Sequence, residues 1–318
     1  MTRILVTARL FAETRAALAP LGALEANEGF DAWDDAERAR RAADCTAMIA
    51  FMTDRVDAAF LDAAPRLRMI ACALKGYDNI DIAACRARGV AVSIVPDLLT
   101  APTAELAVGL LIALARQVPD GDRAVRAGFA GWRPRFYGLG LDGARVAILG
   151  LGALGTAIAA RLAPFGCALV GVDPARDAPG VARLPLAAAL AGADAVVAAL
   201  PLLPDTRHLL DAQGLALLPP HAVLVNIGRG STVREADVLA ALQAGRLGGY
   251  AADVFEMEDW ALPDRPRAID PRLLAHPRTL FTPHLGSATT NARRAIEARA
   301  VANLADHLAG LPPRDAIA

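Results

Sequence analysis

Polar side chains follow three strand-like runs in the last third of the chain, each just after the run ends. Arg229 follows the first run, Glu256 and Glu258 follow the second, and His284 follows the third. Because the carboxyl ends of parallel strands meet at one edge of a sheet, we expect these side chains to lie close together. Histidine suits the role of a base, since its ordinary pKa lies near neutrality. A carboxylate can orient the ring, and an arginine can grip an oxyanion with two N–H groups. The spacing predicts proton transfer with an anionic substrate.

Each of these residues also has a purely structural interpretation. Arg229 stands between glycines and could form a surface turn, and both glutamates could be solvated. A lone histidine is most often part of a structural hydrogen-bond network, and this is our expectation for the other four, His208, His221, His276 and His307.

A glycine-rich loop, GLGALG, follows the strand-like run at 145–149 and opens a helical stretch. In such a loop the first glycine permits a tight turn, the second lets the backbone approach a pyrophosphate, and the third lets the helix pack on the strand. The free amides of the helix N-terminus bind phosphate. The expected cofactor contacts here are Gly150, Gly152, Ala153, Leu154 and Gly155.

Asp173 ends the next strand-like run, roughly 20 residues beyond the loop. Its carboxylate can accept hydrogen bonds from a ribose diol and would repel a 2′-phosphate, so NAD is favoured over NADP. Arg176 lies three positions later and could pair with that phosphate, which leaves NADP open. Asp253 ends a further strand in the same region, and we expect either a contact to the nicotinamide half or a structural turn there.

Apolar runs alternate with alanine-rich stretches along the whole chain, which is typical of parallel α/β architecture. In the first third we expect strands at 4–7, 47–51, 69–73 and 91–94, and helices at 11–18 and 58–64. A proline-containing connector at 96–103 follows, with Thr103 as the cap of a helix at 104–116. Beyond 144 we expect strands at 145–149, 168–172, 195–199, 222–226, 249–252 and 279–282, and helices at 153–162, 233–244 and 292–308. This order predicts a doubly wound nucleotide-binding sheet.

Composition excludes several other classes of protein. The formal net charge of −1 argues against a nucleic-acid binder. The longest apolar helical run, 107–115, is too short to span a membrane, and the N-terminus does not resemble a signal peptide, so we expect a cytoplasmic protein. The four cysteines lack metal-ligand spacing, and no metal is expected.

Lysine is nearly absent. Lysine and arginine together number 33, yet Lys75 is the one lysine. Either Lys75 occurs there by chance, or the position requires a compact ammonium where a planar guanidinium would not fit.

The chain resembles the D-2-hydroxyacid dehydrogenase family over nearly its whole length. The resemblance rests on GLGALG at 150–155, NIGRG at 226–230, DVFEME at 253–258 and Pro283-His284. It implies that Arg229, Glu258 and His284 form the active site, with Glu258 rather than Glu256 as the catalytic glutamate. It adds Thr103, Pro201 and Thr206 to the cofactor contacts. It also implies a flavodoxin-like substrate domain at 1–99 completed by 290–318, an NAD-binding Rossmann domain at 100–289, and a homodimer.

Longer stretches look like the phosphite (phosphonate) dehydrogenase branch of that family. They are 48–57, the loop CALKGYDN at 72–79, VPDLLT at 95–100, GWRPRFYG at 131–138 and YAADVFEMEDW at 250–260. This resemblance implies that Lys75 is catalytic and that the substrate contacts are Lys75, Gly76, Arg229, Met52, Trp132, Tyr137, Ser287 and Arg293. It further implies attack of water on phosphorus, hydride transfer to nicotinamide, and His284, held by Glu258, as the proton acceptor.

Two other functions stay open at this point. The sequence departs from that branch in Ile227-Gly228 before Arg229 and after Ser287, which leaves substrate preference open. The alternatives are an ordinary dehydrogenase of a small 2-hydroxy or 2-keto acid, and a non-catalytic NAD-binding regulator.

Overall fold

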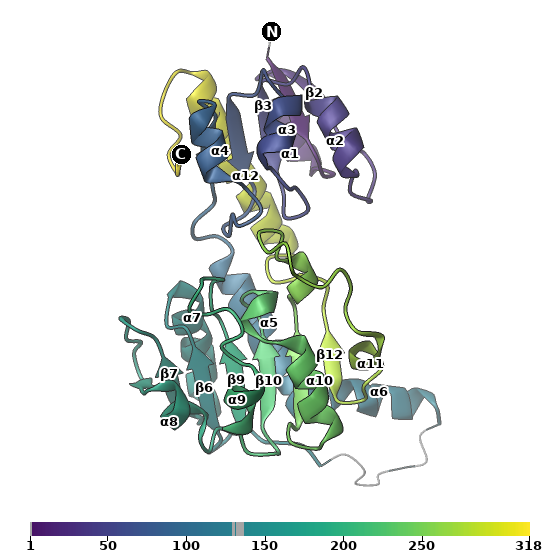
Figure 1. Cartoon of the computed structure of the whole chain (residues 1–318), viewed down its shortest axis with the longest axis vertical. Coiled ribbons are helices and arrows are strands. Elements are labelled where there is room, and N and C mark those ends of the chain that lie inside the picture. Colours follow the sequence, from purple (N-terminus) through teal and green to yellow (C-terminus); the bar gives the residue numbers. More distant parts are fainter. Residues whose placement is uncertain (1, 129–130, 132–136) are drawn as a thin grey trace. The chain divides into compact units, whose positions relative to one another are not determined.

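The computed structural model describes residues 2–128, 131 and 137–318, and it divides into two compact units (Figure 1). Unit 1 comprises Met1–Leu99 and Ala288–Ala318, and unit 2 comprises Thr100–Ser287. The first boundary coincides with the one predicted from the sequence, and the second lies two residues before its predicted place. The predicted fold class, two Rossmann-like α/β domains, is confirmed.

Unit 1 is built on a five-stranded parallel sheet of order β2-β1-β3-β4-β5, the flavodoxin-like order. Helices α1 and α12 pack on one face, and α2, α3 and α4 pack on the other. The strands are β1 (Arg3–Val6), β2 (Ala23–Ala26), β3 (Ala47–Ala50), β4 (Met69–Cys72) and β5 (Ala91–Ser93). The helices are α1 (Ala12–Leu18), α2 (Asp35–Ala42), α3 (Ala58–Ala63), α4 (Ile82–Ala87) and α12 (Thr290–Leu308).

Unit 2 is a doubly wound seven-stranded parallel sheet of order β12-β11-β10-β9-β6-β7-β8. Helices α5 and α7 cover one face, and α8, α9, α10 and α11 cover the other. The strands are β6 (Arg145–Leu149), β7 (Ala168–Val172), β8 (Ala182–Arg183), β9 (Ala195–Ala198), β10 (Val223–Asn226), β11 (Gly249–Ala252) and β12 (Thr279–Phe281). The helices are α5 (Thr100–Ala115), α6 (Val118–Arg126), α7 (Ala153–Leu162), α8 (Leu186–Leu190), α9 (Ala212–Ala216), α10 (Glu235–Gln243) and α11 (Pro271–Leu274). Short 3₁₀ turns are η1 (Ala163–Phe165), η2 (Gly230–Thr232) and η3 (Glu256–Glu258).

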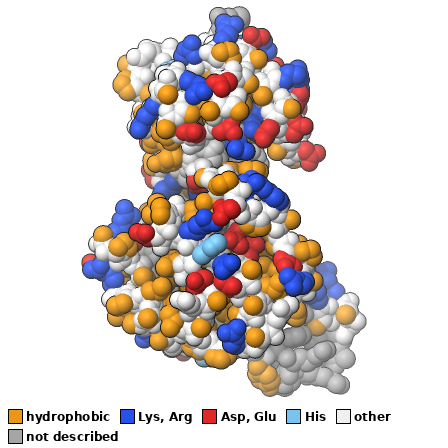
Figure 2. Space-filling model, viewed as in Figure 1, with side chains coloured by type: hydrophobic (Ala, Val, Ile, Leu, Met, Phe, Trp, Pro, Cys, Tyr) orange, Lys and Arg blue, Asp and Glu red, His pale blue; other side chains and the backbone are white. Residues whose placement is uncertain are grey.

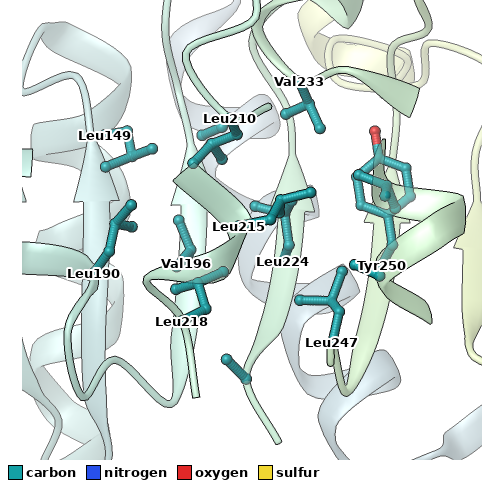
Figure 3. Close-up of a cluster of buried hydrophobic side chains, with 14 of the residues drawn as sticks. Leu149, Leu190, Val196, Leu210, Leu215, Leu218, Leu224, Val233, Leu247 and Tyr250 are labelled. Atoms are coloured by element: carbon teal, nitrogen blue, oxygen red, sulfur yellow. The ribbon is translucent and has the colours of Figure 1, made fainter. Parts of the chain in front are cut away.

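The central strands are apolar on both faces because helices cover both. Along β6, Ala147 and Leu149 face one core and Val146 and Ile148 face the other. Figure 3 shows part of the first core, in which Leu149, Val196 and Leu224 from neighbouring strands meet Leu190 of α8 and Leu215 of α9. Packing on both faces therefore fixes the central strands of the sheet.

The predicted start of the long helix is wrong. Helix α5 begins at Thr100 rather than after Thr103, so Thr103 lies inside its first turn and does not cap it. Pro102 is tolerated there because the first N–H groups of a helix have no partner within it. The elements that were not predicted are either very short or rich in polar or small residues: strands β2 and β8 and helices α2, α4, α6, α8, α9 and α11.

No single helix in the described residues is both long and apolar enough to cross a membrane. Helices α5 and α6 pass that test only when they are counted together, and they are bent by 60° at their junction.

Replacing Leu224 by Ala should destabilise unit 2 strongly. Leu224 is fully buried, and the cavity left by such a truncation costs about 2–5 kcal/mol. Urea unfolding followed by circular dichroism should show a lower midpoint for the transition of unit 2. The matched control is Leu217→Ala, because Leu217 is exposed and its truncation should leave the midpoint unchanged. Equal midpoints for Leu224→Ala and the wild type would contradict the packing described.

Candidate active site

The glycine loop leaves β6 where the order of the sheet reverses, between β6 and β9. Gly150 has φ of +90°, and a Cβ there would lie 2.8 Å from the carbonyl oxygen of Ala199. A Cβ on Gly155 would lie 1.8 Å from the carbonyl oxygen of Gly150. Gly152 is the N-cap of α7 and provides no side-chain cap, so the first amides of that helix are not capped by it. The loop therefore fits a dinucleotide pyrophosphate, which binds such amides.

Asp173 lies beside this loop and is held by backbone amides. Its Oδ2 accepts from the N–H of Leu151 at 2.9 Å, and its Oδ1 accepts from those of Ala175 at 3.0 Å and Arg176 at 2.8 Å. Burial acts to raise the pKa of Asp173, but these bonds and the Arg176 guanidinium outweigh it and lower the pKa. The carboxylate is thus charged and oriented, which suits a ribose diol. The Arg176 guanidinium lies 3.1 Å from the Cβ position of Gly152, so a cation is also present here.

The remaining predicted cofactor contacts lie on the same sheet edge of unit 2. The hydroxyl of Thr206 donates to the carbonyl oxygen of Pro201 at 2.6 Å and accepts from the N–H of Leu203 at 2.8 Å, which closes the loop after β9. The hydroxyl of Thr103 lies 3.0 Å from the Cβ position of Gly286. Thr103 therefore lies next to the loop that bears His284, although it is not a helix cap.

His284 and Glu258 are hydrogen-bonded. The Nδ1 atom of His284 lies 2.6 Å from Oε2 of Glu258, and Oε1 of Glu258 accepts from the N–H of Phe255 at 2.9 Å. Both side chains are about 30% exposed, so the pair is open to a substrate. Because Nδ1 faces Glu258, Nε2 is the ring atom left for proton exchange. Of the two candidate glutamates, Glu258 is the one that holds the histidine.

Asp253 fixes the loop that carries His284. Its Oδ1 accepts from the Thr282 hydroxyl at 2.6 Å and from the N–H of Leu285 at 2.7 Å, and its Oδ2 accepts from the N–H of Gly286 at 2.8 Å. His284 has φ of +55°, a left-handed conformation that is uncommon for residues other than glycine. Burial raises the pKa of Asp253 against these bonds. The carboxylate thus forms a structural turn, while its contact to nicotinamide stays a prediction.

Arg229 stands at the start of η2, directly against the Glu258 turn. The carbonyl oxygen of Arg229 accepts from Nδ2 of Asn226 at 3.0 Å and from the hydroxyl of Thr232 at 2.7 Å. A Cβ on Gly230 would lie 1.9 Å from the carbonyl carbon of Phe255, so the turns of Arg229 and Glu258 are packed backbone to backbone. The arginine between glycines is therefore part of the sheet edge and not an isolated surface turn.

In unit 1, the loops after β3 and β4 are tied together. Lys75 is exposed in the loop after β4, next to Gly76, and Met52 lies in the loop after β3. Buried Asp54 accepts from the N–H of Phe51 at 2.7 Å, and Nδ2 of Asn79 donates to the carbonyl oxygen of Asp54 at 2.5 Å. Asp54 also accepts from the Thr7 hydroxyl. Burial raises the pKa of Asp54 to about 6, opposed by these hydrogen bonds. The Met52 and Lys75 loops thus share one buried support.

Arg293 reaches the same edge of unit 1 from α12. Its guanidinium donates to the carbonyl oxygen of Ala73 at 3.2 Å and lies 5.7 Å from the centre of the Phe51 ring. Burial lowers the pKa of Arg293, opposed by Glu297. Unit 1 therefore presents two cations, Lys75 and Arg293, at the carboxyl edge of its sheet.

Residues 108–286 match the family model described as "D-isomer specific 2-hydroxyacid dehydrogenase, NAD binding domain". The chain belongs to the D-isomer specific 2-hydroxyacid dehydrogenase family. A glyoxylate reductase of Pyrococcus furiosus is 35% identical over 282 residues, covering 85% of this chain and 82% of the relative. A solved protein of Thermus thermophilus has a TM-score of 0.91 with 33% identity, covering all of both chains.

The prediction of NAD as the cofactor is confirmed, because the family model that matches residues 108–286 describes an NAD-binding domain. Another solved relative, with a TM-score of 0.83 and 30% identity over 100% of this chain and 97% of its own, is an NADPH-dependent glyoxylate/hydroxypyruvate reductase of Sinorhizobium meliloti. NADP therefore stays open beside NAD. In the described residues no group of three or more His, Cys, Asp or Glu side chains is placed to hold a metal ion.

One expected substrate contact, Tyr137, is not brought to the edge of unit 2 that bears Arg229 and His284. Trp132 lies outside the described residues. Tyr137 is 80% exposed, and its carbonyl oxygen accepts from Nε2 of Gln117, just beyond the carboxyl end of α5. Leu114, at that end of α5, packs on Gly249 at the amino end of β11, so Tyr137 lies across unit 2 from Arg229 and His284. Ser287, by contrast, directly follows the Asp253-bound loop and is half-buried.

Sequence reasoning missed the acids that support the site. Asp54, Glu235 and Asp259 are buried, and each accepts a hydrogen bond from a backbone amide or a hydroxyl of another segment. Buried acids of this kind have no fixed spacing from their partners in the chain. In the sequence Asp54 stands between Thr53 and Arg55, so no local pattern marks it as buried.

Replacing Glu258 by Gln should lower kcat by roughly 10²-fold, within the range expected for loss of acid–base assistance. The amide retains an acceptor for the N–H of Phe255 but removes the carboxylate from Nδ1 of His284. Steady-state kinetics should show the loss while NADH binding, followed by fluorescence, stays unchanged. Glu105→Gln is the control, since Glu105 is an exposed residue of α5. Wild-type kcat in Glu258→Gln would exclude this pair from catalysis.

Replacing Asp173 by Ala should raise the KM for NAD about 10-fold or more, the effect of losing a charge-assisted hydrogen bond. The ratio of kcat/KM for NAD to that for NADP should fall as well, because the negative charge is removed and Arg176 remains. Asp177→Ala is the matched control, since Asp177 is exposed and pairs with Arg183. An unchanged cofactor ratio would show that Asp173 does not select the ribose.

Proposed function

We propose that the protein oxidises phosphite to phosphate with NAD as the hydride acceptor. The observation that carries this proposal is Lys75, the one lysine in a chain with 32 arginines, exposed in the loop after β4. The stretches that resemble the phosphite dehydrogenase branch include this loop. The proposal rests on the family membership for hydride chemistry and on Lys75 for the substrate.

Charge favours a compact anion. Phosphite is near its dianion at neutral pH and has no carbon chain to bury, so its oxygens need cations rather than an apolar pocket. We propose Lys75 and Arg229 as the two cations that bind them, with Arg293 as a further one. An ammonium is a compact point charge, while a guanidinium binds two oxygens at once.

The balanced reaction converts phosphite, water and NAD⁺ to phosphate, NADH and a proton. Bound NAD supplies the acceptor carbon to which the P–H bond transfers its hydrogen and electron pair. A P–O bond forms from water. His284 accepts the released proton at Nε2, and Glu258 stabilises the imidazolium through Nδ1. Arg229 and Lys75 hold the phosphorus oxygens in place.

A second function, interconversion of a small 2-keto acid and its 2-hydroxy acid, is favoured by the relatives. Among the relatives with similarity over most of the chain, several are named glyoxylate reductase, one glyoxylate/hydroxypyruvate reductase and one hydroxyphenylpyruvate reductase. The same residues serve this chemistry. Arg229 would bind the carboxylate, and His284 would donate its proton to the carbonyl oxygen as hydride arrives. The names of the relatives favour this function, and Lys75 favours the first. A non-catalytic regulator is disfavoured by the intact set of Arg229, Glu258 and His284.

Two further expectations remain predictions. The family resemblance implies a homodimer, which light scattering would test, and composition implies a cytoplasmic location, which fractionation of the source cells would test.

Phosphite and NAD mixed with the protein should give NADH and phosphate in equal amounts, followed by absorbance and a phosphate assay. Lys75→Ala should lower kcat/KM for phosphite by about 10- to 100-fold, as expected for loss of a charge-assisted contact. Lys75→Arg tests whether any cation suffices, and Arg66→Ala, an exposed arginine of the same unit, is the control. Glyoxylate and hydroxypyruvate with NADH and NADPH form the parallel panel. Turnover of these acids without turnover of phosphite would overturn the proposal in favour of the second function.

A further inference from the structure

We propose that Glu256, together with His208 and Glu235, is a positioning network that fixes the turn bearing Glu258 against the turn bearing Arg229. The inference rests on the acid–base chemistry of Arg229, Glu258 and His284, and it holds for phosphite and for a 2-keto acid alike. The contacts all lie within unit 2, and none of these three residues is expected to contact substrate or cofactor.

The first contact is a reciprocal pair between η3 and the start of α10. The N–H of Glu256 donates to Oε1 of Glu235 at 2.9 Å, and the N–H of Glu235 donates to Oε2 of Glu256 at 3.1 Å. Both residues are buried, at 7% and 5% exposure. Each carboxylate thus binds the backbone N–H of the other residue. Glu256, two positions before Glu258, is therefore held through both its N–H and its carboxylate.

The second contact brings in the loop after β9. The Nε2 atom of His208 lies 2.6 Å from Oε1 of Glu256, and the N–H of His208 donates to the carbonyl oxygen of Ser231 at 2.7 Å. His208 has φ of +52°, so this loop adopts a left-handed conformation at the point of contact. His208, expected to be structural, therefore links Glu256 to a residue two positions after Arg229.

The third contact lies on the far side of Glu258. The Oδ2 atom of Asp259 accepts from the N–H of Ser231 at 2.6 Å, and Asp259 is buried. Acids on both sides of Glu258, at 256 and 259, thus bind the segment that follows Arg229. On the face of unit 2 shown in Figure 2, acidic and basic side chains gather around a histidine side chain.

These buried acids are costly as stabilising elements. Removing carboxylates from water costs free energy that their hydrogen bonds only partly return. Burial raises the pKa of Glu235 to about 7, opposed by the N–H of Glu256 and reinforced by the charges of Glu256, Glu258 and Asp259. The buried acids are explained if they orient the catalytic residues, because displacing a catalytic group by about 1 Å can lower the rate roughly 10²-fold.

Substituting Glu235 by Gln gives a pH test of this arrangement. The raised pKa means that Glu235 contributes its full stability below its ordinary value of 4.5 and loses it as pH rises through about 7. The Tm of Glu235→Gln minus the Tm of the wild type should therefore increase as pH rises from about 5 to about 9. A Tm difference that does not change with pH would show that Glu235 does not titrate in this network. The charged or titratable groups around it are Glu256, Glu258, Asp259, His208, Arg234, Asp237 and Tyr250.

The deciding experiment compares Glu256→Gln and His208→Gln with Asp194→Asn. Asp194 also pairs with a histidine of unit 2, His221 at 2.8 Å, but beside the amino ends of the strands. The two network variants should lower kcat about 10-fold or more while the dissociation constant of NADH stays within about twofold. The downfield proton NMR signal of the His284–Glu258 hydrogen bond, assigned by its loss in Glu258→Gln, should broaden or vanish in both. Asp194→Asn should change neither readout.

Wild-type kcat and an unchanged His284 signal in Glu256→Gln and His208→Gln would overturn the inference. If one variant fails to fold by circular dichroism, the other decides the outcome. The NMR readout needs no substrate. If the wild type turns over neither phosphite nor a 2-keto acid, the proposed function fails while the network is still tested.

Discussion

The hydrogen bond between His284 and Glu258 joins two residues 26 positions apart, and it depends on the two neighbouring strands that precede them. The parallel register of β11 and β12, which pairs Ala252 with Phe281, brings the ends of both strands level. Asp253 then bends the chain after β12 so that the imidazole turns toward the carboxylate. Without this register and this buried acid, a histidine and a glutamate on separate loops would have no fixed geometry.

Local constraints are what the sequence reveals best. The glycine loop could be predicted because positions 150 and 155 have no room for a Cβ, and such positions leave glycine in the chain. Six of the seven strands of unit 2 were predicted to within about a residue, because central strands covered on both faces are largely apolar. The exposed two-residue edge strand β8 was missed. Glu258 could be distinguished from Glu256 only through the family resemblance, because both follow the same strand at almost the same distance.

Non-local support was not predictable. Several supporting contacts join segments that are far apart in the sequence, and no local pattern shows which segments meet. They are the hydrogen bond between Asp54 and Asn79, the reciprocal pair of Glu235 and Glu256, and the turn formed by Asp253. Thr103 was misplaced as a cap because proline suggested a break, whereas the first turn of a helix accepts proline. Tyr137 was placed by resemblance alone, and its position depends on how the chain leaves α5.

Helix α12 closes one face of the unit 1 sheet, although it comes from the last part of the chain. During synthesis the strands that carry Ile4 and Ile49 leave the ribosome long before Ile296 and Leu304, which cover them in the finished protein. Unit 2 is contiguous and can fold in that interval. The apolar face of the N-terminal sheet that α12 covers therefore stays incomplete until residues 290–308 have been synthesised.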